Sequence, residues 1–188
     1  PKLADFDLDT NDADEDDKSK ITDTYSGNWK TCLVSNTASD NYLEDEADEY
    51  FFNNTYVISE NKGDVVVIEG EGTAIQLTGV TKSDGGKIKV TLYTDDSETP
   101  VQEPQILSLE SDRTYTHATI FEWKMADFDD PAKAKPVKLK MVVENEGGKV
   151  ILDSAKLFRE DNYSVKETPF TFDWATVRLS MYVKFSVA

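Results

Sequence analysis

The strongest constraint on the fold is the pattern of residues 175–187, near the C-terminal end of the sequence. Every second residue there is apolar: Ala175, Val177, Leu179, Met181, Val183, Phe185 and Val187. A period of two predicts a β-strand with one buried face. The opposite face, extended backwards, carries Phe172, Trp174, Arg178 and Tyr182. We expect these flat side chains to meet solvent or a ligand.

Short β-rich segments separated by turn residues occupy the chain from Asn28 onwards. Clusters such as Ser83-Asp84-Gly85-Gly86 and Glu146-Gly147-Gly148 supply the conformations that hairpin turns need. About ten strands at this spacing are typical of an antiparallel sandwich or barrel, and we predict an all-β sandwich of jelly-roll type. The expected strands are 28–34, 49–59, 64–69, 73–78, 87–94, 104–109, 113–124, 137–144, 149–152, 155–158 and 170–187.

The first 25 residues differ from the rest because aspartate dominates them. Few of their side chains are apolar, and such a composition is typical of a flexible segment. We therefore predict a disordered acidic arm over residues 1–25, acting as a linker or tether, and a single folded domain over residues 26–188.

The charge of the chain restricts its partners. Thirty-seven acidic residues against twenty lysines and arginines give a formal net charge of −17. This field repels phosphate backbones and anionic lipid, so we expect no nucleic-acid partner. No run approaches the ~20 apolar residues of a membrane span. Cys32 is the single cysteine, which excludes an internal disulfide.

Aromatic side chains on strands are the main candidates for binding. Sugar rings present C–H faces that pack on aromatic rings, while carboxylates and amides orient the hydroxyl groups. The proposed ligand-binding residues are Phe172, Trp174, Arg178 and Tyr182, and Tyr56 and Tyr93 are further candidates. Tyr115, His117, Phe121 and Trp123 share one face of an expected strand, where a place in the core is the alternative interpretation.

Metal binding and catalysis have weaker support. Asp127, Asp129 and Asp130 are candidate oxygen ligands for a structural calcium ion, with solvated loop charge as the alternative. His117 is the only histidine, and on a strand it is more often a packed residue than a general base. No Gly-x-Ser-x-Gly nucleophile motif occurs. We therefore predict a protein that is not an enzyme.

Two families resemble parts of the chain. The order of the stretches 72–79, 87–93, 113–116 and 150–158 resembles jelly-roll carbohydrate-binding modules over about half the chain. This resemblance implies a sandwich that binds a glycan on a sheet face. Gly27-Asn28-Trp29 is similar to the first-strand motif of lipocalin barrels, which implies a pocket for a small apolar ligand.

Together these features predict a non-catalytic binding domain of a secreted or cell-surface protein, whose partner is a polysaccharide. Two alternatives stay open: an adhesin or surface lipoprotein domain that binds a surface protein through an aromatic interface patch, and a lipocalin-like small-ligand binder.

Overall fold

The protein is an all-β chain. A computed structural model describes residues 3–7, 21–33, 51, 55–130 and 132–158, and none of these lies in a helix. The described strands are β1 (Leu3–Asp7), β2 (Thr22–Ser26), β3 (Lys30–Leu33), β4 (Thr55–Ser59), β5 (Val65–Gly72), β6 (Ala74–Thr81), β7 (Lys87–Thr94), β8 (Gln105–Ser108), β9 (Tyr115–Lys124), β10 (Val137–Gly147) and β11 (Val150–Phe158).

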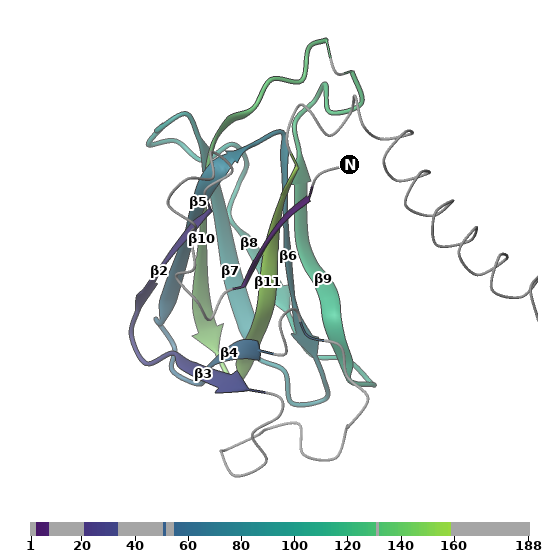
Figure 1. Ribbon diagram of the computed structural model, residues 1–188. Coiled ribbons are helices and arrows are strands. Elements are labelled where there is room, and N and C mark those ends of the chain that lie inside the picture. Colours follow the sequence, from purple (N-terminus) through teal and green to yellow (C-terminus); the bar gives the residue numbers. More distant parts are fainter. Residues whose placement is uncertain (1–2, 8–20, 34–50, 52–54, 131, 159–188) are drawn as a thin grey trace, which may run out of the picture.

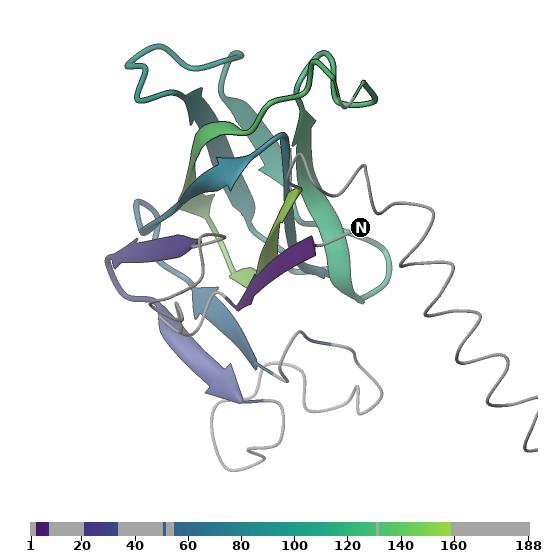
Figure 2. The ribbon, with the colours of Figure 1, turned by 45° about the horizontal axis from the view of Figure 1, so that its top comes forward.

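Two antiparallel sheets face each other as the layers of a sandwich (Figures 1 and 2). The first, sheet A, has the order β3-β4-β11-β6-β9, and β1 also pairs with β11. The second, sheet B, has the order β2-β5-β10-β7-β8. From β4 to β7, and again from β8 to β11, each strand lies in the sheet opposite its predecessor, as in jelly-roll sandwiches. The predicted fold class is confirmed.

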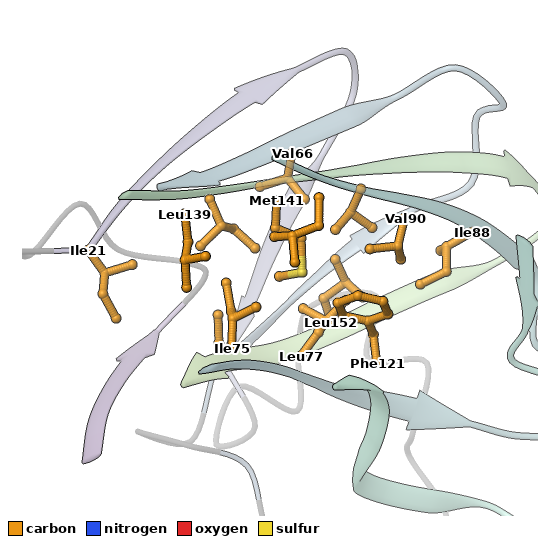
Figure 3. Packing of buried hydrophobic residues seen from close by; sticks show 14 of the residues in the cluster. Ile21, Val66, Ile75, Leu77, Ile88, Val90, Phe121, Leu139, Met141 and Leu152 are labelled. Atoms are coloured by element: carbon orange, nitrogen blue, oxygen red, sulfur yellow. The ribbon is translucent and has the colours of Figure 1, made fainter. Parts of the chain in front are cut away.

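The core lies between the two sheets. It is formed by the apolar side chains that occur at every second position of the strands. In sheet B, Val90 pairs with Val143 and Leu92 with Met141, and all four side chains are buried. Ile75, Leu77 and Leu152 point toward them from sheet A (Figure 3). Because side chains of both sheets fill this space, the structure is a sandwich and not a lipocalin-type barrel. Trp29 of the Gly-x-Trp motif donates its ring N–H to the Val65 carbonyl, 3.1 Å away.

Residues 150–158 form one strand, β11, where the sequence predicted two, over 149–152 and 155–158. Between Leu152 and Ala155 the pairing of β11 with β6 shifts, which places Asp153 and Ser154 in a bulge. Both residues are buried and polar. A bulge keeps a strand continuous while interrupting its alternation, so the sequence pattern falsely indicated a break.

Two strands of the sandwich come from the N-terminal segment. Residues 3–7 form β1 beside β11, and residues 22–26 form β2 along β5. Ile21 is 3% exposed and belongs to the main core. Two short strands therefore lie within residues 1–25, for which the sequence predicts a disordered acidic arm, and backbone pairing and one apolar anchor place them in the sandwich.

The C-terminal strand expected at 170–187 lies outside the described residues. The prediction for that segment therefore stays a prediction.

Candidate functional site

The outer face of sheet B is hollowed. The hollow has a volume of about 1030 Å³ and crosses three strands, β5, β10 and β7, beside the loop that follows β7. Its lining residues are Thr22, Glu69, Gly70, Glu71, Tyr93, Asp96, Ser97, Glu98, Lys138, Leu139, Lys140 and Val142. We call this surface the sheet B hollow.

Strand register explains why polar side chains gather there. Leu139 and Met141 face the core, so Lys138, Lys140 and Val142 face outwards in the alternation of β10. Lys140 pairs with Tyr93 on one side and with Glu69 on the other. Residues directly opposite in an antiparallel pair have Cβ atoms about 5 Å apart. A phenol ring, an ammonium and a carboxylate therefore form one row across the sheet.

A second row of charged residues also lines the sheet B hollow. Lys138 pairs with Glu71 on β5, and its Nζ lies 2.7 Å from Oδ2 of Asp96 in the loop after β7. The hydrogen bond to Asp96 raises the pKa of Lys138. This exposed ion pair links the loop after β7 to β10.

The other charged groups of the hollow remain available to a ligand. Within the described part of the chain, no hydrogen bond or ion pair engages the side chains of Glu69, Glu71 or Lys140, and all three are exposed. Tyr93 is half-buried and lines the hollow. The arrangement offers one aromatic face with hydrogen-bond donors and acceptors around it, which suits a ligand rich in hydroxyl groups.

The aromatic residues proposed from the sequence are distributed differently. Phe172, Trp174, Arg178 and Tyr182 lie outside the described residues. Tyr56 is fully buried and packs on Phe51, with ring centroids 4.8 Å apart. Of the described candidates, Tyr93 is the one that lines the sheet B hollow.

The face predicted for Tyr115, His117, Phe121 and Trp123 does not exist as one surface. Phe121 and Trp123 pack in or against the core, whereas Tyr115 is 50% exposed. The pairing of β9 with β6 shifts twice along this stretch. A register shift interrupts the regular alternation of inward and outward side chains along a strand. The sequence carries no signal for such shifts.

The aspartates proposed as metal ligands lie in the connection between β9 and β10. The described residues contain no group of three or more histidine, cysteine or acidic side chains that could hold a metal ion. Asp130 instead accepts a hydrogen bond from the Ala132 N–H at 3.1 Å and pairs with Lys133 at 3.0 Å. Asp127 and Asp129 belong to no such group within this part of the chain.

A second polar cluster lies on sheet A and contains the only histidine. His117 Nδ1 contacts the buried Asp153 carboxylate, and its Nε2 lies 3.2 Å from Lys156 Nζ. Thr78 and Ser154 hydroxyls, 2.8 Å apart, lie beside Asp153. The sequence singles out His117 but not its partners Asp153 and Lys156, because both lie on β11, more than thirty residues further along the chain.

The chain was compared with family models, with curated proteins and with solved structures. No family model matches this chain, and no curated protein matches it. Solved structures do resemble it. The catalytic domain of Agl-KA aligns with a TM-score of 0.46 and 10% identity over 84% of this chain, which spans 27% of that one.

Two further structures are carbohydrate-binding modules. TmCBM61, solved with β-1,4-galactotriose, aligns with a TM-score of 0.38 and 12% identity, covering 82% of this chain and 99% of its own. A family 6 carbohydrate-binding module aligns with a TM-score of 0.41 and 11% identity, covering 83% of this chain and 93% of its own. Carbohydrate-binding modules, which the sequence resembles, are therefore among the structures to which this chain is similar.

Among the described residues, no helix is long and apolar enough to cross a membrane.

Proposed function

We propose that this protein is a non-catalytic domain that binds a polysaccharide in the sheet B hollow. The observation that carries the proposal is the row of Glu69, Lys140 and Tyr93 across a concave face. A sugar ring stacked on Tyr93 would bury its C–H face, and its hydroxyl groups would reach the carboxylate and the ammonium.

The charge of the molecule favours a neutral chain of sugars in this hollow. Four acidic residues and two lysines line it, within a protein of net charge −17. An anionic polymer would meet repulsion from this field, whereas hydroxyl groups accept and donate hydrogen bonds without it. A volume near 1030 Å³ accommodates more than one sugar unit.

Three finer parts of the proposal rest on the sequence alone. Phe172, Trp174, Arg178 and Tyr182 are proposed as a second stacking surface for the same polymer. Location in a secreted or cell-surface protein accords with a polysaccharide partner. A structural calcium ion remains part of the proposal, and its test is the same binding measurement made with calcium and with a chelator.

The experiment is affinity electrophoresis against plant, algal and microbial polysaccharides. For a polysaccharide that retards the wild type, we expect Tyr93→Ala to weaken binding about tenfold or more, the equivalent of about 1.4 kcal/mol. Tyr115→Ala is the matched control, because Tyr115 is an exposed tyrosine on sheet A.

Equal retardation of Tyr93→Ala and wild type would remove the sheet B hollow from the proposal. Trp174→Ala, run in the same gels, tests the second surface separately. If no polysaccharide retards the folded protein, the proposal fails, and a surface protein becomes the partner to seek.

A further inference from the structure

Three neighbouring strands of sheet A depart from regular pairing at one place. These strands, β11, β6 and β9, lie side by side (Figure 1). Beside β6, β9 shifts its register between Leu77 and Thr78 and again between Gly79 and Thr81, while β11 shifts between Leu152 and Ala155. Within the second β9 shift, His117 adopts a φ of 48°. A left-handed conformation costs a non-glycine residue about 1 kcal/mol or more, and such outliers gather at functional sites.

A buried carboxylate fixes the orientation of this histidine. Asp153 is fully buried, and its Oδ2 contacts His117 Nδ1. The Thr78 hydroxyl lies 3.4 Å from the same oxygen. A carboxylate can only accept, so Nδ1 carries the proton and donates it to Asp153. The ring is thereby held with Nε2 directed away from Asp153.

Lys156 faces this second nitrogen. Its Nζ lies 3.2 Å from Nε2, so the ammonium donates to the lone pair of a neutral imidazole. When His117 gains a proton, Nε2 becomes a donor too, and two donors then face each other. An oxygen atom that accepts from both resolves this conflict, while Asp153 balances the charge of the imidazolium.

We propose that His117 and Lys156 form a binding site for an oxyanion, such as a carboxylate, sulfate or phosphate group, which fills when His117 is protonated. The site lies on sheet A and is independent of the sheet B hollow. The imidazole is 22% exposed, so a small anionic group reaches it from solvent.

Charged residues of three strands lie around the site. On β9, Glu122 is already engaged by Lys124 at 3.0 Å and by the Gln76 amide at 3.0 Å. From β11 come Asp153 and Lys156 themselves. On β1, Asp5 occupies the register position opposite Lys156.

The test uses the fact that the chain has one histidine, whose ring C–H signal in a proton NMR spectrum reports this site alone. The signal is followed from about pH 5 to about pH 8 in sodium sulfate and in sodium chloride at equal ionic strength. Because the anion binds the protonated form, sulfate should raise the midpoint of the His117 titration by about 0.3 pH unit or more, a twofold or larger change.

Lys156→Met should abolish the difference between the two salts, whereas Lys140→Met, on the other sheet, should keep it. Dispersed amide signals verify that each variant is folded. Repeating the titration in phosphate and in glucuronate distinguishes the oxyanions that the site accepts. Equal midpoints in chloride and in all three oxyanions, or a sulfate effect that survives Lys156→Met, would overturn the proposal without affecting the proposed polysaccharide binding.

Discussion

Asn145 joins β10 to the end of β4 and to the turn that follows β10. Its side-chain amide donates to the Ser59 carbonyl at 3.3 Å, to Ser59 Oγ at 3.0 Å and to the Gly148 carbonyl at 3.1 Å. Its Oδ1 accepts the Gly147 N–H at 2.7 Å. Ser59 in turn donates to Asp64 at 2.6 Å. Each member of this buried network satisfies another, so removal of one leaves unpaired polar groups.

We predict that Asn145→Ala lowers the free energy of unfolding by about 2 to 4 kcal/mol. The control is Asn28→Ala, because Asn28 joins the network through its backbone N–H, which alanine retains. Urea unfolding followed by tryptophan fluorescence measures both. A loss below about 0.5 kcal/mol for Asn145→Ala would contradict the network.

Asp84 provides a prediction about pH. Its hydrogen bond with Lys149, at 2.8 Å, lowers the pKa of Asp84, against the effect of burial, and Lys82 adds to the lowering. A carboxyl group whose pKa is lower in the folded than in the unfolded protein stabilises the fold at every pH above its unfolded-state pKa. This stabilisation is lost as the pH falls through the folded-state pKa.

The Asp84 side chain is half exposed, so we expect Asp84→Asn to destabilise the protein by less than about 1 kcal/mol at neutral pH. The difference from wild type should disappear at an acid pH at which Asp84 is protonated in the folded protein. Unfolding free energies at both pH values check this. A difference that persists in acid would show that the ion pair is not its cause.

At the scale of elements, β2 shows what composition conceals. Its residues 22–26 look like part of an acidic linker, yet they pair along β5, and the preceding Ile21 enters the core. Even Asp23, on the inward face of β2, is buried. Neither the alternation nor the apolar content of so short a strand distinguishes it from its acidic surroundings.

We predict that Ile21→Ala destabilises the fold by about 2 to 4 kcal/mol, as expected for a buried isoleucine. Thr24→Ala, at an exposed position of the same strand, should change stability by less than about 0.5 kcal/mol. Chemical unfolding compares the two. Similar small effects for both variants would mean that β2 does not contribute to the core.

Strand β9 shows the opposite limit of sequence reasoning. Its residues 115–124 were correctly predicted to form a strand, because β-branched and aromatic residues dominate it. The surface predicted for it was wrong, because the pairing of β9 with β6 shifts twice between Tyr115 and Phe121. Bulges depend on neighbouring strands, and a period of two cannot reveal them.

For the whole molecule, the two-layer architecture could be predicted because one buried face per strand permits few solutions. The division of the strands between the sheets could not, since pairs such as β6 and β9 are distant in sequence. The same holds for the sheet B hollow. Glu69, Tyr93 and Lys140 come from three strands and share a row only through register, so Tyr93 was one candidate among many.

The measurement that tests the central claim most directly is a map of backbone amide shifts in ¹⁵N-labelled protein, as a retarding polysaccharide fragment is added. We predict that the perturbed amides lie along Glu69–Glu71, Tyr93–Glu98 and Lys138–Val142. Additional changes at residues 172–182 are expected if the second stacking surface also binds the polysaccharide. Perturbations confined to sheet A, or to residues 172–182 alone, would contradict a polysaccharide site in the sheet B hollow.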